Sequence, residues 1–287
     1  MVQSLPGDKQ AGALRPGVHA MKNPKYNKPP VVETVLGVQF PEIAAFGNVH
    51  FGLYWETIRQ RYPKPPQDQP RIAWAVETFP HRLLPAGLNL RLSDQVPQRM
   101  WFTAESGSEL IQLQPDRFHF NWRGEEGKPY PSYRINSRKF FEEFARFEAF
   151  CDKQGWEPPK PNLAEVTYVN HFFPVEGETS IDLFQKAFLG IGFADVAEMP
   201  CLPERAVFNR VYPIEGDKGR LYVEATLAQK RDRTEFVLLK MTARVLLPPS
   251  GAVSLADGLQ KAHDWVVGGF AAVTRPEIQQ QRWERIE

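Results

Sequence analysis

The strongest constraint on the fold is an alternation of apolar and polar residues along short consecutive segments. Residues 117–123 read RFHFNWR, so that every second residue is aromatic and the residues between are polar. This period of two indicates a strand with two unlike faces, because successive side chains of a strand point to opposite sides. Similar segments at 98–104 and 109–114 come before it and are separated by turn-forming residues. The pattern predicts an antiparallel meander.

Other segments extend this reading over the rest of the chain. Strands are expected at 31–40, 71–78 and 162–174, with a less regular candidate at 88–92, and then at 205–212, 220–228 and 234–247. Apolar residues at steps of three and four predict helices that begin near Asn48, Ser137, Thr179 and Ser254. The loop at 155–161, rich in proline, separates the first set of elements from the second.

The order of elements predicts an α+β fold of two similar halves, each an antiparallel sheet packed against helices. Residues 31–157 and 158–287 both run strand, helix, antiparallel strands, long helix. An internal duplication and a single α+β domain with two sheet–helix layers are both consistent with this order. Residues 1–30 are rich in Gly, Pro and Lys without hydrophobic period, so we expect a flexible arm, and Met21 is an alternative start.

Charge argues against a protein whose whole surface is built for nucleic acid. The net charge is +1, but residues 1–30 carry +4 and the remainder −3. A nucleic-acid-binding domain is usually strongly basic, because neutralisation of phosphates supplies much of the affinity. A local basic patch remains compatible with these numbers. The chain has no run of about 20 apolar residues and no signal-peptide pattern, so we expect a cytoplasmic protein without a membrane partner.

Known catalytic signatures are missing from the sequence. It contains no GxGxxG after a strand, no P-loop, no HExxH, no GxSxG and no CxxC pair, and Cys151 and Cys201 lie far from other metal ligands. We therefore expect no cofactor, no metal and no catalytic residue of a common class. A non-enzymatic protein is favoured, although an enzyme of an unfamiliar class stays open, because a catalytic triad is defined by geometry.

One candidate binding surface follows from the alternation in residues 117–123. Its polar side chains can contact phosphates or acidic groups of a partner, as the polar faces of nucleic-acid-binding sheets do, and they are Arg117, His119, Asn121 and Arg123. A solvated outer face explains the same pattern equally simply. The aromatic residues Trp101, Phe118, Phe120 and Trp122 are read as core, with a base-stacking platform as the alternative.

A candidate pocket is expected between the sheet and a long helix. Asn170 and His171 are neighbours in a strand, so they point to opposite faces and one of them is expected to face the interior. Glu33 and Glu165 occupy matching positions in the opening strands of the two halves, and if both were buried and close, one would have a raised pKa. His263 lies on the last helix beside apolar residues. For all five, a hydrogen-bonded structural role is the alternative to a site.

Three segments together resemble a sporadically distributed family of uncharacterised bacterial and archaeal proteins. They are NKPPVVETVLGVQ at 27–39, the strand residues Tyr168–His171, and a C-terminal set of His263, Asp264, Trp265, Phe270, Thr274, Pro276, Glu277 and Trp283. The resemblance covers residues 24–287 and implies no established reaction, cofactor or catalytic residue. The order of elements is also similar to the repeat of TATA-box-binding proteins and to helix-grip folds, which hold ligands between a curved sheet and a long helix. Fold analogy of this kind does not determine function.

Three functions are consistent with these features. The first is a binding or regulatory protein that acts through a protein partner or through self-association. The second is nucleic-acid binding by a sheet face with help from the basic arm. The third is a small-ligand-binding protein, or an enzyme, which predicts a cavity of several hundred Å³ lined by polar groups such as Asn170 or His171.

Overall fold

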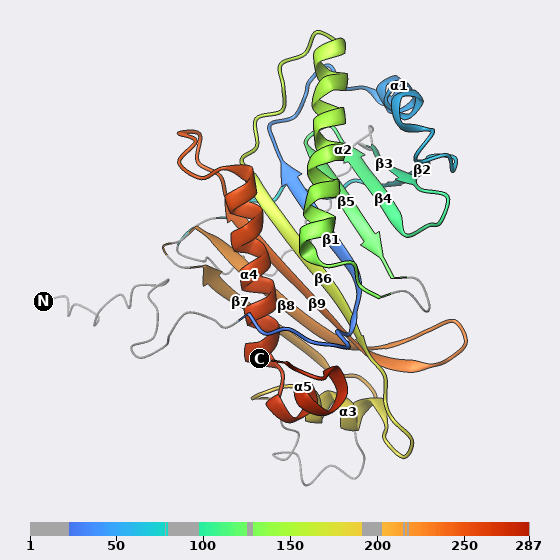
Figure 1. Cartoon of the computed structure of the whole chain (residues 1–287), viewed down its shortest axis with the longest axis vertical. Helices are drawn as coiled ribbons and strands as arrows, with labels where there is room; N and C mark the ends of the chain where they lie inside the picture. The colour runs from blue at the N-terminus through green and yellow to red at the C-terminus, as the bar shows by residue number, and fades with distance from the viewer. Residues whose placement is uncertain are drawn as a thin grey trace, which may run out of the picture.

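Strands rich in β-branched and aromatic residues make one antiparallel sheet, with helices packed on one face (Figure 1). The computed structural model describes residues 23–77, 79, 98–124, 129–190, 203–214, 216 and 218–286, and the statements below concern these residues. The strands are β1 (Val31–Gln39), β2 (Gln67–Pro70), β3 (Gln98–Thr103), β4 (Glu109–Gln114), β5 (Arg117–Arg123), β6 (Leu163–Phe172), β7 (Val207–Ile214), β8 (Gly219–Gln229) and β9 (Glu235–Leu246). The helices are α1 (Asn48–Ile58), α2 (Tyr133–Lys153), α3 (Ser180–Ala187), α4 (Leu255–Val273) and α5 (Pro276–Trp283).

The nine described strands lie in the order β2-β3-β4-β5-β1-β6-β9-β8-β7. Strands β1 and β6 open the two halves of the chain, and they pair with each other at the centre, with Leu36 opposite Val166. The α+β class and the antiparallel pairing are therefore confirmed. The halves do not form separate sheets, because the β1–β6 ladder joins them into one.

The two sides of the sheet repeat the same neighbour relations. Strand β1 pairs with β5, the last strand of its half, and β6 pairs likewise with β9. In each half a short helix follows the first strand and a long helix follows the last, as the sequence predicts. Duplication of an ancestral half stays a prediction, since this arrangement does not test common descent.

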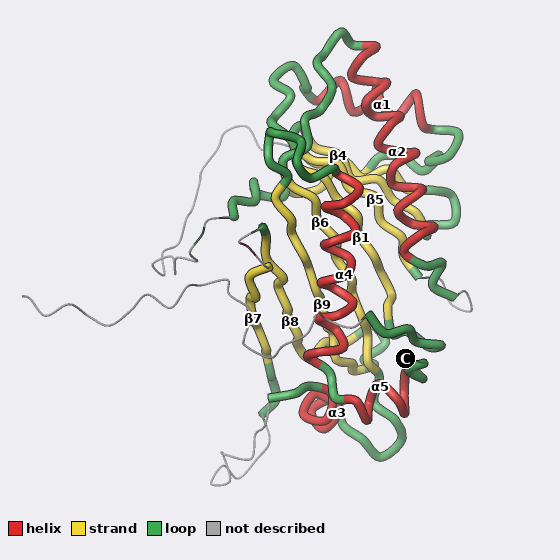
Figure 2. Tube along the Cα trace, turned by 60° about the vertical axis from the view of Figure 1, so that its left-hand side comes forward, coloured by secondary structure: helices red, strands yellow, loops and turns green. Residues whose placement is uncertain are grey.

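Helices α2 and α4 lie side by side across the same face of the sheet, and Figure 2 shows α4 in front of the strands of the second half. The apolar side of α2 buries Phe140, Phe144 and Phe147 against Phe118 of β5. Helix α4 buries a stripe from Leu259 to Val273. The two layers thus enclose the hydrophobic core, which holds most of the aromatic residues.

Helix starts are partly as expected. Ser254 caps α4 by accepting a hydrogen bond from the backbone N–H of Asp257, as predicted. Thr179 caps α3 in the same way. Helix α2 begins at Tyr133 rather than near Ser137, so the expected start is wrong by one turn. The earlier start matters, because it places the first turn of α2 beside the cavity described below.

Residues 71–77 do not form the strand that the sequence predicts. They run without regular secondary structure over the sheet face opposite the helices, and we call them the strap. The strand β2 lies just before them, at Gln67–Pro70, where no strand was predicted. The expected strand at 88–92 falls outside the described residues.

The described start of the chain is bonded to its end. The backbone N–H groups of Asn27 and Lys28 donate to the carbonyl oxygens of Glu284 and Trp283, and Ile286 N–H donates to Lys25 O. Residues 23–30, which the sequence assigned to a flexible arm, are therefore held against the C-terminal tail, while residues 1–22 lie outside the described part. No helix of the described chain is long and apolar enough to span a membrane.

Candidate functional site

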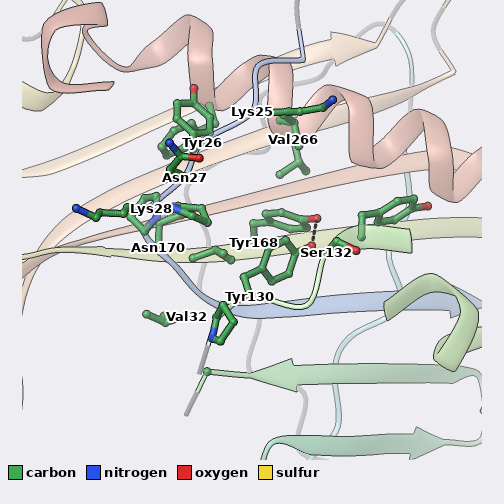
Figure 3. Close-up of a pocket in the computed structure, with 18 of the residues that line it drawn as sticks. Lys25, Tyr26, Asn27, Lys28, Val32, Tyr130, Ser132, Tyr168, Asn170 and Val266 are labelled. Atoms are coloured by element: carbon green, nitrogen blue, oxygen red, sulfur yellow. Dashed lines mark hydrogen bonds between the residues drawn. The ribbon is translucent and has the colours of Figure 1, made fainter. Parts of the chain in front are cut away.

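A pocket of about 1130 Å³ lies on the helix side of the sheet (Figure 3). Its floor comes from β1 and β6, and its walls come from the residues before β1, the start of α2 and the middle of α4. The side chains or backbone that line it belong to Asn23 to Val32, Trp122, Gly124, Pro129, Tyr130, Ser132, Tyr133, Arg134, Tyr168, Asn170, His171, Phe173, Lys230, His263, Val266, Val267, Phe270 and Ile286. Ligand pockets typically enclose about 300–1,000 Å³, so this space is large enough for a drug-sized molecule.

Two tyrosine hydroxyls meet at the floor of the pocket. Tyr168 projects from β6 and Tyr130 from the segment before α2, and their hydroxyl oxygens are 2.7 Å apart (Figure 3). Burial raises the pKa of Tyr130 to about 12 and raises the pKa of Tyr168 well above its usual value. Both phenols are therefore protonated at neutral pH. One of the two hydroxyl protons forms the hydrogen bond between the tyrosines, and the other can be donated to a bound molecule.

A stacked pair of rings lies on the helix side of the same pocket. The ring of Tyr133, in the first turn of α2, stacks on His263 of α4 with centroids 3.9 Å apart and planes 19° apart. Burial lowers the pKa of His263, and the carboxylate of Asp264 opposes that effect at 3.4 Å. The pair joins α2 to α4 across the pocket, so the predicted pocket residue His263 does line a cavity.

Ser132 has a backbone conformation that few residues other than glycine adopt. Its φ is 83° and its ψ is 152°, a region in which a Cβ atom crowds the backbone. The residue precedes α2 and lies beside Tyr130 in the pocket (Figure 3). Strain of order 1–3 kcal/mol is found mainly where the surroundings enforce it, and such places are often ligand sites.

The outer wall of the pocket is the segment that pairs with the C-terminal tail. Tyr26 packs edge-on against Phe270 and Trp283, and its hydroxyl donates to Gln279 Oε1 at 3.0 Å. Asn23 donates to Asp264 of α4 at 2.9 Å. These contacts hold residues 23–30 over the cavity, and they connect the wall to α4 and α5.

The charged residues that line the pocket are all basic, while the carboxylates of Asp264 and Glu284 contact lining residues from outside it. Lys25, Lys28, Arg134 and Lys230 are among the lining residues, and no described lining residue carries a carboxylate. Lys28 is paired with Glu284 at 2.5 Å. Lys25 comes from the residues before β1, Arg134 from the start of α2 and Lys230 from the turn after β8, so a negatively charged group at the mouth of the cavity meets positive charge from several sides.

The candidates Asn170 and His171 divide between the two faces of the sheet. Asn170 points toward the helices, is buried, and donates to Leu239 O at 3.3 Å (Figure 3). The ring of His171 packs against Phe236 at a centroid distance of 4.2 Å, and its backbone N–H donates to Pro30 O. Burial lowers the pKa of His171. Asn170 is therefore a pocket side chain, whereas His171 borders the cavity chiefly through its backbone.

The candidate surface on β5 is largely covered. Arg117, His119 and Asn121 are only 2, 3 and 1% exposed, and Arg123 alone is partly open. The reading of this side as a solvated face is therefore wrong for three of the four residues. The strap lies against Arg117 at one end of this face, where Arg117 donates to Ala73 O. Alternation alone cannot distinguish a polar face that is covered from one that is exposed to solvent.

Side-chain amides hold the strap in place. Gln39 accepts from Ala75 N–H at 2.9 Å and donates to Ala75 O at 3.1 Å, and Gln114 makes the same pair of bonds to Ile72 at 3.1 and 3.0 Å. Each glutamine side chain thus makes the pair of backbone hydrogen bonds that a neighbouring strand would otherwise make. Arg117 adds a bond to Ala73 O, and both Arg220 and Tyr222 bind Glu77.

Glu33 and Glu165 lie on this covered face and not in the pocket. They are on the same side of neighbouring strands, but Glu165 stands opposite Gly37, four residues from Glu33. Glu33 binds Asn121 and Arg123, and Glu165 binds Arg244 at 2.6 Å. Burial alone would raise the pKa of Glu165, but the charge of Arg244 outweighs it and lowers the pKa to about 2. The two carboxylates are therefore not the close pair that a raised pKa would require, and both have the alternative, hydrogen-bonded role.

Three of the four aromatic residues that were predicted to belong to the core do so. Phe118 and Phe120 are fully buried under α2, and Trp122 is nearly so. Trp101 faces the other way, where the guanidinium of Arg123 lies 4.9 Å from its ring centroid.

The pocket residues that sequence reasoning missed include Ser132 and four tyrosines, Tyr26, Tyr130, Tyr133 and Tyr168. Tyr130, Ser132 and Tyr133 belong to the segment PYPSYRIN at 129–136, in which no site residue was predicted. The density of tyrosine between prolines was the available signal. Among the described residues, no group of three His, Cys, Asp or Glu side chains could hold a metal ion.

Comparisons of this chain with protein-family models, with curated proteins and with solved structures find no match. The resemblance to the sporadically distributed family therefore stays a prediction.

Proposed function

We propose that this chain is a small-molecule-binding protein whose ligand, an amphipathic anion, occupies the pocket between the sheet and helices α2 and α4. The observation that carries the proposal is the cavity itself. It combines an aromatic lining, protonated tyrosine hydroxyls at the floor and cations at the rim. Apolar rings favour an apolar body, and the rim charges favour an anionic head group.

The covered face weakens the nucleic-acid alternative. A protein that binds nucleic acid through a sheet face needs the polar side chains of that face accessible, and Arg117, His119 and Asn121 are buried. A protein partner or self-association stays a prediction, because no described surface favours a particular partner. The pocket, by contrast, favours a ligand with an apolar body and an anionic head group.

A pair of matched dyes tests the proposal directly. 1-Anilinonaphthalene-8-sulfonate and N-phenyl-1-naphthylamine share a ring system and differ in the sulfonate group. We expect both to gain fluorescence with the full chain, and the sulfonate to bind several-fold more tightly. Val32→Trp should fill the cavity, since Val32 lines it, and should weaken binding of both dyes at least tenfold.

The matched control is Val207→Trp, which adds the same ring to an exposed position of β7 and should change nothing. Binding to Val32→Trp as tight as to the unmodified chain would reject the pocket. Replacing Arg134 and Lys230 by Gln should weaken the sulfonate and leave the neutral dye unchanged. Equal affinities for the two dyes in every variant would reject the anionic head group but not the pocket.

A further inference from the structure

We propose that the sheet face opposite the helices contains a second site, which binds a small oxyanion, a carboxylate or a phosphate, beside the strap. Its ligands are Arg99 and Arg117, and together with the neighbouring His119 we call them the arginine cluster. The site is independent of the pocket, because it lies on the other side of the sheet.

The three residues are neighbours on one face. Arg117 and His119 are two positions apart on β5, so their side chains emerge on the same side. Gln112 of β4 stands directly opposite His119. Arg99 of β3 reaches the same place, since its Nη1 donates to Gln112 Oε1 at 2.6 Å.

Several polar atoms of the arginine cluster are buried without a hydrogen-bond partner. They are Nε and Nη1 of Arg117, Nε of Arg99 and Nε2 of His119. Arg117 uses only Nη2, which donates to Gln39 Oε1 at 2.6 Å and to Ala73 O at 3.2 Å. A guanidinium stays charged at any physiological pH, so it cannot escape this cost by losing its proton.

The carboxylates around the cluster are already engaged by other cations. Glu165 binds Arg244, Asp116 binds Arg71 at 2.7 Å, and Glu77 binds Arg220. Glu165 Oε1 is 3.8 Å from His119 Nε2, which is beyond a hydrogen bond. Within the described chain, therefore, Arg99 and Arg117 have no ion pair of their own.

A small oxyanion provides both of the things that Arg99 and Arg117 lack, a counter-charge and hydrogen-bond acceptors. It supplies a negative charge between two guanidinium groups and several acceptor oxygens for their unused N–H groups. His119 is neutral there, because burial lowers its pKa to about 3, and its Nε2 is turned toward Gly37 and Glu165. The strap borders the site through its bonds to Gln39, Gln114 and Arg117.

Thermal unfolding of the full chain tests the site with inorganic phosphate and with acetate as probes. Each is titrated against chloride at constant ionic strength. A bound anion raises the melting temperature in a saturating way, because it binds only the folded state. We expect such a rise for at least one probe, and a loss of at least tenfold in apparent affinity for Arg117→Met. Which probe acts separates a carboxylate ligand from a phosphate.

Controls separate this site from general salt effects and from the pocket. Phosphate stabilises most proteins by exclusion from their surface, so Arg61→Met, which removes a cation paired with Glu143 elsewhere, must keep the full rise. Arg99→Met replaces Arg117→Met if the latter does not fold. Equal rises in melting temperature in all variants would mean that the anion acts only by exclusion from the protein surface. No rise in the unmodified chain would mean that water fills the site. A rise lost on replacing Arg134 and Lys230 would place the anion in the pocket. Each of these three results overturns the proposal.

Discussion

The imidazole of His119 occupies the space in which Gly37 would carry a side chain. The two residues face each other in the β1–β5 ladder, and a Cβ atom on Gly37 would lie 2.5 Å from His119 Cδ2. On its other side Gly37 faces Glu165 of β6. The missing side chain therefore lets His119 and Glu165 approach across the central strand, to 3.8 Å.

Gly37→Ala should destabilise the fold by about 2–4 kcal/mol, because a methyl group would have to displace a buried ring. Chemical denaturation measures the change in the free energy of unfolding. Gly52→Ala is the matched control. It lies in α1, where a Cβ atom would meet no other atom within 4 Å, so it should stabilise the protein by up to about 1 kcal/mol. Equal effects of the two substitutions would contradict the close approach.

Glu165→Gln should cost about 3–5 kcal/mol at pH 7, since it leaves the buried charge of Arg244 without its closest partner. The pKa of Glu165 is lowered to about 2 in the fold, so its contribution is present above the unfolded pKa and is lost as pH falls through about 4 toward 2. The difference between the unmodified chain and Glu165→Gln should shrink over that range. Glu33→Gln, at a more exposed pair, should cost less.

His119 makes stability depend on pH in a higher pH range than Glu165 does. Its pKa is about 3 in the fold, below the value of about 6.5 in an unfolded chain, so the unfolded state binds more protons between these values. Stability should therefore fall as pH decreases from about 6.5 toward 3, by at most about 1.4 kcal/mol per pH unit from this residue. Unfolding curves of His119→Gln at pH 7 and pH 5 should differ less than those of the unmodified chain. An unchanged difference would show that His119 is accessible to protons.

Ser132→Gly should stabilise the protein by about 1 kcal/mol or more, because glycine adopts a φ of 83° without steric cost. Thermal unfolding measures the gain. Ser137→Gly, inside α2, is the control and should be destabilising by up to about 1 kcal/mol. A loss of stability in Ser132→Gly would mean that the serine hydroxyl contributes more than the strain costs.

Local patterns were sufficient for most of the secondary structure. The period of two in residues 117–123 and the stripe from Leu259 to Val273 both correspond to the buried sides that the structure has. These patterns are readable because each element must bury one side against its neighbour. The apolar side of β5 was correctly assigned for the same reason.

The strap shows where local patterns fail. Residues 71–77 have the composition of a strand, but their backbone is bonded to the side chains of Gln39 and Gln114. Glutamine amides can imitate a neighbouring strand only when the fold brings them to the right place. The sequence of residues 71–77 does not indicate that these two glutamine side chains will lie beside it.

The sequence by itself determined most of the elements, their antiparallel class and the side of each that enters the core, because these depend on the spacing of apolar residues along the chain. The tertiary structure decided that the polar side of β5 is covered and that a cavity opens between α2 and α4. Both features are made by segments far apart in sequence, such as Tyr130 with Tyr168 and Tyr133 with His263. A pattern in one segment carries no information about which distant segment lies over it, so burial of polar groups and enclosure of a pocket emerge only when the chain is folded.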